Sequence, residues 1–201
     1  MVHDIASDFH KDPIDQFLAW FEKATTAKVS HPNEATLSTI GSNGYPRSRT
    51  VYYKGMHQRQ FTFYTNYESD KAKEINENAR VSLLFFWHPP LDYQIRVEGL
   101  ANKMSREESE KYFNSRPRQS QISAWASPQS RLVSNRQELE ALYQKIEKQF
   151  EGKDIPCPPF WGGYVVKANY FDFMILDKYR LHDRFCYKLS GSEWKMERLG
   201  P

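Results

Sequence analysis

The chain has 201 residues, a length that supports one substantial hydrophobic core but is short for two. Its 28 basic residues nearly balance 25 acidic ones, so the overall charge does not indicate a nucleic-acid-coating protein, and any anion site must be a local cluster. Cys157 and Cys186 lie far apart with no zinc-type spacing, which excludes an obvious metal site and favours reduced thiols.

The first half of the chain predicts a helix followed by short strands. Residues 1–11 are expected to form a flexible tail, and Asp12-Pro13 has the residue types that begin a helix. The apolar stripe of that helix consists of Ile14, Phe17, Leu18 and Phe21. Strands are predicted over 35–40, 48–54, 61–65, 81–87 and 94–100; 35–40 and 94–100 alternate, and 81–87 has the pattern of a buried strand. A short helix over 69–78, with Ser69 as candidate cap, lies among them.

The second half predicts two helices and then strands again. Ser105 and Glu108 form a capping box for a helix over 105–115. A longer helix begins at Ser134 or Asn135. Its expected buried stripe is Leu139, Leu142, Ile146 and Phe150. The expected strands are 161–166, 170–176, 181–187 and 194–198.

Seven or eight short strands with hairpin turns and no repeated strand–helix–strand rhythm predict a mainly antiparallel fold. We expect a closed β-barrel with helices packed outside, in a single domain over 12–201. The aromatic share of 15% favours a core completed across a dimer interface. No apolar leader and no membrane-spanning run occur, which predicts a soluble, cytoplasmic protein.

The stretch from Tyr112 to Arg131 carries the strongest chemical signal. It contains three arginines, five serines and three glutamines but no Asp or Glu, and Pro117 and Pro128 brace it. Guanidinium groups and hydroxyls are the donors that hold a phosphate. This stretch therefore predicts an anion-binding wall of a pocket.

Three further basic groups accompany this stretch. Arg49 and Lys54 bracket one predicted strand, and Lys71 lies near the start of a short helix, where backbone amides favour anions. Arg180, His182 and Arg184 would share one face of a strand, a pattern suited to an anionic, titrating ligand.

Each of these groups also has a structural interpretation. Any single arginine is more often a surface residue than a ligand, and Trp125 and Trp161 are more often core residues than stacking platforms. A basic and aromatic RNA-binding face is a further alternative. Dinucleotide, P-loop, zinc-protease and nucleophile-elbow motifs do not occur.

Several segments match one known family in register from about Asp12 to the C-terminus. By these segments the chain resembles the pyridoxamine 5′-phosphate oxidases. The matching segments are 48–54 (SRTVYYK), 63–66 (FYTN), 81–87 (VSLLFFW), 94–99 (QIRVEG), 112–130 (YFNSRPRQSQISAWASPQS), 156–163 (PCPPFWGG), 180–187 (RLHDRFCY) and 198–201 (RLGP).

The resemblance implies an FMN-binding split β-barrel and an obligate homodimer with each flavin held between two subunits. It implies flavin contacts at Arg49, Thr50, Val51, Tyr52, Tyr53, Lys54, Tyr64, Thr65, Lys71, Gln94, Gln129, Ser130, Met174 and Arg184. It implies that the substrate phosphate is bound by Lys54, Tyr112, Arg116 and Ser120. Arg180 and His182 would bind the substrate over its pyridine ring and act as the catalytic residues.

The implied reaction is oxidation of pyridoxamine or pyridoxine 5′-phosphate to pyridoxal 5′-phosphate, with dioxygen as acceptor and hydrogen peroxide as product. Two departures from the family pattern concern the flavin. Asp70 stands where the family usually has an arginine, and Met174 replaces a tryptophan, which predicts weaker FMN binding. The alternatives are a relative that binds flavin or pyridoxal phosphate with weakened catalysis, and a flavin oxidase for another substrate such as a phenazine precursor.

Overall fold

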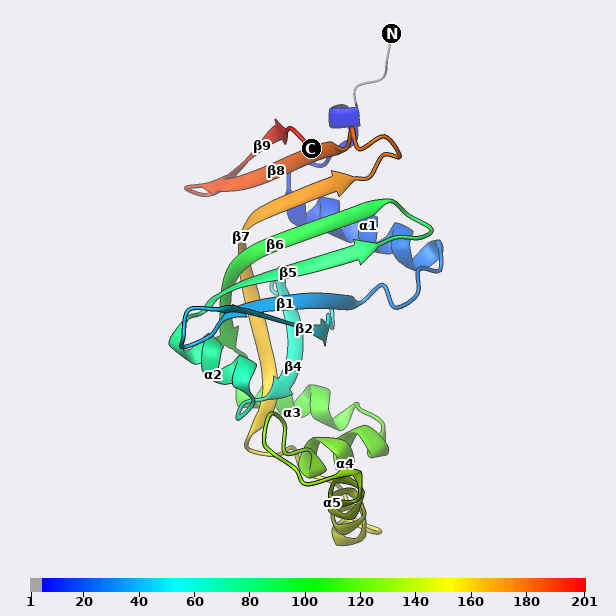
Figure 1. The fold of residues 1–201 in the computed structure, drawn as a ribbon, viewed down its shortest axis with the longest axis vertical. Helices are drawn as coiled ribbons and strands as arrows, with labels where there is room; N and C mark the ends of the chain where they lie inside the picture. Colours follow the sequence, from blue (N-terminus) through cyan, green and yellow to red (C-terminus); the bar gives the residue numbers. More distant parts are fainter. Residues whose placement is uncertain (1–4) are drawn as a thin grey trace.

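The computed structural model describes residues 5–201, which form a nine-stranded antiparallel sheet with helices packed against it (Figure 1). The strands are β1 (Glu34–Ile40), β2 (Pro46–Tyr52), β3 (Met56–His57), β4 (Gln60–Asn66), β5 (Arg80–Trp87), β6 (Tyr93–Lys103), β7 (Trp161–Ile175), β8 (Asp183–Ser190) and β9 (Glu193–Leu199). The helices are η1 (Ile5–Asp8), α1 (Pro13–Thr26), α2 (Asp70–Glu77), α3 (Arg106–Asn114), α4 (Arg118–Ala126) and α5 (Arg136–Gln149). The predicted mainly antiparallel fold is confirmed.

Strand β7 joins two parts of the sheet. Its first half pairs with β4, its second half pairs with β8, and β6 runs beside both halves. The sequence predicted two separate strands here, but the chain continues through Lys167 and Asn169 as one strand of 15 residues. The pairing of β6 with β7 shifts in register after Glu98. Only glycine fits at position 99, because a Cβ there would lie 2.3 Å from the Lys167 carbonyl oxygen.

The sheet closes on itself next to β2. The strand order runs β2-β1-β5-β6-β7-β4-β3, so β2 and β3 are the ends of the path. After β2, the Lys54 amide donates to the Thr62 carbonyl (2.9 Å), and the Thr62 amide donates to the Gly55 carbonyl (3.0 Å). These bonds connect the end of β2 to β4. The outer edge of β2 itself has no strand partner within the described chain.

Helix α1 closes one end of the barrel core. The Asp12 carboxylate caps it by accepting from the Ile14 amide (2.8 Å). Phe17 is fully buried, with its ring 4.7 Å from that of Phe61, and burying such a side chain contributes roughly 1.5–3 kcal/mol. Trp20 continues the buried face, whereas Leu18 is 40% exposed. The predicted stripe was wrong at Leu18 because the buried face follows Ile14, Phe17 and Trp20.

The N-terminal segment is packed where the structure describes it. Residues 1–4 of the expected tail lie outside the described residues. Residues 5–8 form η1, and the Phe9 ring lies 4.5 Å from that of Phe185. The Tyr187 hydroxyl donates to the His10 carbonyl (2.6 Å). Residues 5–11 are therefore not the free tail that the polar sequence predicted, because Phe9 gives them an apolar anchor.

The helices α3, α4 and α5 form a separate end of the molecule (Figure 1). They share a second apolar cluster, made of Phe113, Ile122, Phe150, Ile155, Cys157 and Trp161. Helix α4 was not predicted, since its nine residues bury only Ile122 and Ala126. Asn135 caps α5 by accepting from the Glu138 amide (2.9 Å). The predicted stripe of α5 is only half-buried within the helix, and Phe150 just beyond it is buried.

Two smaller expectations gave mixed results. Ser69 precedes α2 as predicted, but its hydroxyl donates to the Asn66 carbonyl (2.7 Å) and does not cap the helix. Cys157 and Cys186 are both buried and form no disulfide with each other, in agreement with the reduced thiols predicted from their spacing. None of the helices within residues 5–201 is long and apolar enough to cross a bilayer.

Candidate active site

A cavity of about 490 Å³ lies where the edge of β2, strand β4 and the helices α3 and α4 meet. It collects most of the residues that the sequence assigned to ligands. The predicted residues that line it are Thr50, Val51, Tyr52, Lys54, Tyr64, Thr65, Lys71, Tyr112, Arg116, Ser120 and Gln129. The structure thus brings the stretch from Tyr112 to Gln129 together with residues from far earlier in the chain.

The four residues expected to bind the substrate phosphate converge from three places. Lys54 follows the end of β2, next to Gly55 in a left-handed conformation (φ 94°). Tyr112 lies in the last turn of α3, and Arg116 lies in the short connection to α4. Ser120 lies in the first turn of α4. All four line the same cavity, as a shared phosphate site requires.

Arg116 is the most unusual of these residues. Its Nη1 atom is buried and has no hydrogen-bond partner among the described residues. Burial lowers the pKa of the guanidinium, while Tyr112 and Cys157 act in the opposite direction. A buried donor without an acceptor costs about 1–3 kcal/mol or more when charged. An anion in the cavity would remove that cost.

An aromatic wall borders the cavity. The Tyr64 and Tyr112 rings stack with centroids 3.8 Å apart and planes 17° apart, and Tyr64 also stacks on Trp161 at 5.3 Å. Burial raises the pKa of Tyr64 to about 12, so its hydroxyl stays a neutral donor. Trp161 is both a core residue and a lining residue, and the sequence indicated only the first role.

A second cationic corner surrounds Lys71. Its Nζ donates to Gln129 Oε1 (2.9 Å), Thr65 Oγ1 (3.3 Å) and Ser69 Oγ (3.3 Å). Burial lowers the pKa of Lys71, and the nearby charge of Arg49 adds to this effect. Within residues 5–201, the hydrogen-bond acceptors of this ammonium are neutral oxygens, and the charges of Asp70 and Glu74 only partly offset the lowering of its pKa. Such a group is well placed to bind an anion that enters the cavity.

Several residues that lined the cavity were missed by the sequence interpretation. They are Asn66, Pro117, Ser123, Ala124, Ser127 and Trp161. Ser123 and Ser127 lie one turn apart at the end of the unpredicted helix α4. Recognising that helix would have placed them on the same side as Ser120, at helical spacing.

Arg49, Tyr53 and Ser130 do not line the cavity. Arg49 forms an ion pair with the buried carboxylate of Glu74 (2.9 Å). Tyr53 is buried against Phe17, with ring centroids 5.4 Å apart. Ser130 has φ 65°, and its Oγ accepts from the Asp70 amide (3.2 Å). Strand alternation and the turn after α4 direct these side chains elsewhere.

The Asp70 carboxylate points away from the cavity. It is exposed and forms an ion pair with Lys73 (3.6 Å). It lines a different depression, together with Arg47 and Glu74. The carboxylate that the sequence suggested could repel a phosphate therefore does not line the cavity, although its charge still acts on Lys71.

Three predicted flavin contacts form a second group on the sheet. Gln94, Met174 and Arg184 lie in register across β6, β7 and β8. Arg184 donates to Asp172 Oδ2 (2.7 Å), and Arg96 also contacts this carboxylate (3.0 Å). Asp172 is 5% exposed, so Arg184 is held by a buried partner.

The predicted alignment of Arg180, His182 and Arg184 on one strand was wrong. Strand β8 begins at Asp183, and Arg180 has φ 64° in the turn before it. The His182 Nδ1 accepts from the Asp177 amide (2.9 Å), and the Asp177 carboxylate accepts from the Tyr179 amide (2.8 Å). These side-chain-to-backbone bonds stabilise a turn in place of the strand.

The row of Gln94, Met174 and Arg184 does not line the cavity. Strand β7 carries Trp161, a cavity residue, at its start and Met174 near its end. Figure 1 shows β7 running from the helical end to β8 and β9. Within one chain, the cavity and the row at Met174 are therefore separate groups.

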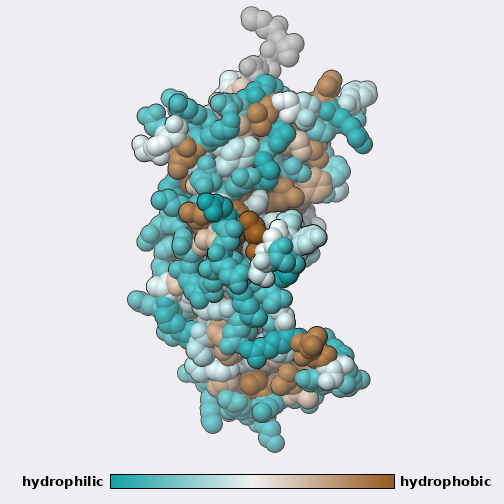
Figure 2. Space-filling view, turned by 60° about the vertical axis from the view of Figure 1, so that its left-hand side comes forward, coloured by the Kyte–Doolittle hydropathy of each residue, from teal (hydrophilic) through white to brown (hydrophobic). Residues whose placement is uncertain are grey.

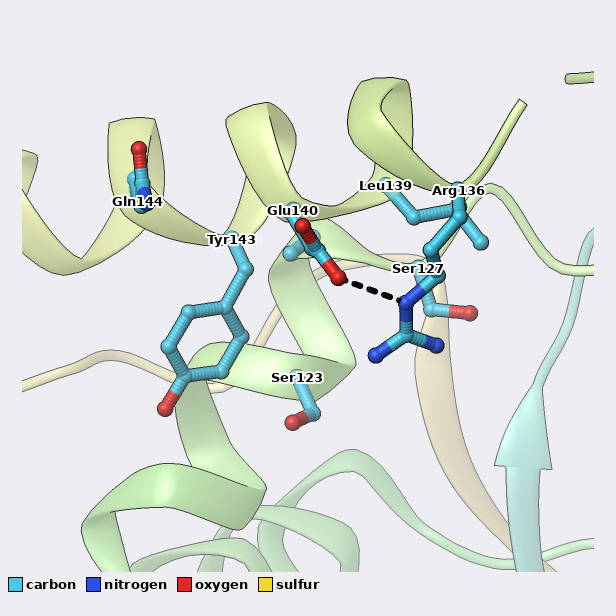
Figure 3. A pocket seen from close by; sticks show the side chains of 8 residues that line it. Ser123, Ser127, Arg136, Leu139, Glu140, Tyr143 and Gln144 are labelled. Carbon is cyan, nitrogen blue, oxygen red and sulfur yellow. Dashed lines mark hydrogen bonds and ion pairs between the residues drawn. The ribbon is translucent and has the colours of Figure 1, made fainter. Parts of the chain in front are cut away.

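The helical end also carries a groove of about 530 Å³ between α4 and α5 (Figure 3). Arg136 and Glu140 form an ion pair there (2.8 Å), and Tyr143 of α5 and Ser123 of α4 both line the groove. Figure 2 shows hydrophobic side chains at the surface of this end, and Leu132 is fully exposed. This groove contains no residue that the sequence assigned to a ligand.

Comparison with known proteins gives a consistent result. Residues 21–150 match the family model described as pyridoxamine 5′-phosphate oxidase. Residues 161–201 match the pyridoxine 5′-phosphate oxidase C-terminal dimerisation region, which supports a homodimer.

Curated relatives cover nearly the whole chain. The pyridoxine/pyridoxamine 5′-phosphate oxidase of Rubrobacter xylanophilus is 48% identical over 94% of this chain and 87% of its own length. That of Crocosphaera subtropica is 45% identical over 96% of this chain and 92% of its own length.

Solved structures share the fold. PhzG from Burkholderia lata 383, in complex with tetrahydrophenazine-1-carboxylic acid, aligns with a TM-score of 0.91 at 27% identity, over 100% of this chain and 98% of that one. A pyridoxamine 5′-phosphate oxidase-related, FMN binding protein from Nostoc punctiforme aligns with a TM-score of 0.75 at 17% identity, over 96% of this chain and 100% of that one. The sequence and structural matches together show that the chain belongs to the pyridoxamine 5′-phosphate oxidase family.

Proposed function

We propose that this protein oxidises pyridoxamine 5′-phosphate and pyridoxine 5′-phosphate to pyridoxal 5′-phosphate, using FMN and dioxygen and releasing hydrogen peroxide. The observation that carries the proposal is the buried, unpaired Nη1 of Arg116 in a cavity that also contains Lys54, Tyr112 and Ser120. Two cations and two hydroxyls match the acceptor oxygens of a phosphate ester. The names of the curated relatives support the same substrates.

The chemistry of the remaining donors fits FMN. Lys71, Thr65 and Gln129 form a corner of neutral oxygens and one cation that would hold the flavin phosphate. Thr50, Val51 and Tyr52 line the cavity from the terminal strand β2, whose outer edge offers unpaired backbone groups to a flavin ring. When bound, FMN supplies the acceptor for a hydride from C4′ of the substrate and passes the electrons to dioxygen.

The protein itself binds and orients the substrate. Lys54, Arg116 and Ser120 would fix the phosphate, and the ring wall that includes Tyr64 and Tyr112 would limit how the pyridine ring lies. With the amine substrate, loss of the hydride leaves an imine, and water converts it to the aldehyde and ammonia.

A second subunit would complete the site. The cavity of one chain is lined by none of Gln94, Met174 and Arg184. It is also not lined by Arg180 and His182, which lie in the turn before β8. A two-fold homodimer would place this row of one protomer against the cavity of its partner. Arg180 would then position the substrate ring, and His182 would accept or return protons near C4′.

The direct test is to purify the protein, record a flavin spectrum and add pyridoxamine 5′-phosphate. Aldehyde and hydrogen peroxide should form in equal amounts when FMN is present. Bound flavin without turnover would instead support a carrier or sensor with weakened catalysis.

The likeness to PhzG raises a second candidate, oxidation of a phenazine precursor. The ligand named for that structure is a carboxylic acid, whereas Lys54, Tyr112, Arg116 and Ser120 here form a set suited to a phosphate. Parallel assays with pyridoxamine 5′-phosphate and with a dihydrophenazine carboxylic acid would separate the two. Turnover of only the second compound would overturn our proposal.

A further inference from the structure

Arg116 faces a conflict that most buried arginines do not. It is a cation with a buried Nη1 donor, and Tyr112 and Cys157 are the only groups that raise its pKa against the effect of burial within the described residues. A carboxylate partner would satisfy the guanidinium, but it would also compete with an incoming phosphate. The structure shows a different kind of partner.

The guanidinium lies over the face of an indole. Arg116 Cζ is 4.7 Å from the centroid of the Trp161 ring, and it is 5.7 Å from that of Phe113. A cation over an aromatic face is attracted by the ring quadrupole, and the N–H groups at the edges of the guanidinium stay free. Trp161 can therefore compensate the buried charge without occupying its donors.

The position of the indole is fixed by two sets of contacts. Its ring continues the stack of Tyr64 and Tyr112, with planes 13° and 4° from theirs. Its backbone lies against α3, where Arg106 Nη1 donates to the carbonyls of Pro158 (2.7 Å) and Trp161 (3.4 Å). Because α3 also leads directly into Arg116, one helix sets the relative position of the cation and the ring.

We infer that Trp161 is a positioning residue for substrate phosphate, because its indole face holds the unpaired Arg116 guanidinium ready for the anion. The inference rests on the proposed function, since it concerns the same phosphate. It assigns Trp161 a role in phosphate affinity that is separate from hydride transfer.

The test compares Trp161→Leu with Trp161→Phe in the FMN-loaded enzyme. Trp161→Leu should raise KM for pyridoxamine 5′-phosphate about five- to tenfold, the fold-change expected for loss of a desolvated cation–π contact, and kcat should stay within about twofold. Trp161→Phe keeps an aromatic face and should recover part of the affinity. Trp125→Phe is the matched control, because Trp125 packs on the same apolar cluster but does not line the cavity, and its KM should not change.

Two further measurements separate positioning from a general structural role. Trp161→Leu should lower kcat/KM clearly less for unphosphorylated pyridoxamine than for pyridoxamine 5′-phosphate, because only the second substrate carries the phosphate. In an Arg116→Ala background, Trp161→Leu should add no further increase in KM, since the contact is already lost. Equal losses for both substrates, or additive losses in the double variant, would overturn the inference.

Inorganic phosphate allows the inference to fail independently of the proposed function. Calorimetric titration of the holoenzyme should show phosphate binding about five- to tenfold weaker in Trp161→Leu than in wild type. That result would support the role of Trp161 even if wild type did not oxidise pyridoxamine 5′-phosphate. Equal phosphate affinity in two folded proteins would overturn it, and Trp161→Phe replaces the leucine variant if the latter does not fold.

Discussion

The cavity at the helical end and the row of Gln94, Met174 and Arg184 differ in how their charges are used. In the cavity, the buried Nη1 of Arg116 has no partner among the residues described, and Lys71 donates its hydrogen bonds to neutral oxygens. In the row, Arg184 already forms a close ion pair with the buried Asp172. The cations of the cavity can therefore still bind an anion, whereas the ion pair of the row fixes the Arg184 side chain in place. This difference suggests that the cavity supplies ligand affinity and the row supplies geometry.

The largest expected effect comes from breaking the ion pair in the row. Asp172→Ala would leave Arg184 and Arg96 without their buried carboxylate, which should lower the free energy of unfolding by about 3–5 kcal/mol. Urea unfolding of the variant measures this loss. Asp183→Ala is the control, because its pair with Arg198 is more exposed. A loss below about 1 kcal/mol would mean that the row is not held by this charge.

Removing the unpaired cation of the cavity should change substrate binding strongly and the free energy of unfolding little, the reverse of Asp172→Ala. Arg116→Ala should raise KM for pyridoxamine 5′-phosphate about 100-fold, because charged hydrogen bonds to the phosphate are lost. Its unfolding free energy should fall little, since no native ion pair is broken. Steady-state kinetics and urea unfolding test both points. Lys111→Ala, an exposed change on the preceding helix α3, serves as the control, and an unchanged KM for Arg116→Ala would remove that residue from the site.

A third prediction concerns the network that keeps Arg49 out of the cavity. Burial alone would raise the pKa of Glu74, but hydrogen bonds from Thr39 and Arg49 and the charge of Arg49 lower it overall. A lowered folded-state pKa contributes stability that is present above the unfolded pKa of about 4.3 and is lost as pH falls through the folded pKa.

Glu74→Gln should therefore cost about 1–2 kcal/mol near pH 7, and the difference from wild type should shrink toward pH 3. Unfolding curves at several pH values measure this difference. A gap between the two proteins that stays constant from pH 7 to pH 3 would contradict the lowered pKa.

The smallest expected effect is at Asp70. Its carboxylate is exposed, faces Lys73 and does not line the cavity, so Asp70→Arg should change the Kd for FMN less than about threefold. Lys71→Met is the positive control and should weaken FMN binding about tenfold. Fluorescence titration of FMN measures both. A much tighter complex for Asp70→Arg would show that the carboxylate does repel the flavin phosphate.

The sequence was most informative where local patterns decide structure. The caps at Asp12 and Ser105 and the alternation of β1 and β6 were predictable, because each depends on residues close in the chain. Motif resemblance also identified most of the residues that line the cavity. That these residues lie around one cavity could not be predicted from periodicity alone.

The wrong predictions have physical causes that strand alternation and helical periodicity do not detect. Strand β7 remained one strand because β6 pairs with it from Tyr164 to Ile175, across the point where the sequence predicted a break, and no local pattern in 161–175 reveals this pairing. The turn before β8 forms through side-chain-to-backbone bonds of Asp177 and His182, and simple alternation does not detect them. Helix α4 has too few apolar residues for a periodic signal, and it is held by the cluster around Phe113.

The position of the cavity and of the row at the two ends of β7 also has a consequence for dimers that combine two different variants. If each active site combines the cavity of one subunit with the Arg180 turn of its partner, a variant at Arg116 and a variant at Arg180 each impair a different half of the site. In a mixed dimer, one of the two sites would contain both defects and the other would contain neither. Random exchange of the two inactive proteins should then restore about a quarter of the wild-type activity. No recovery would mean that each chain builds its site alone.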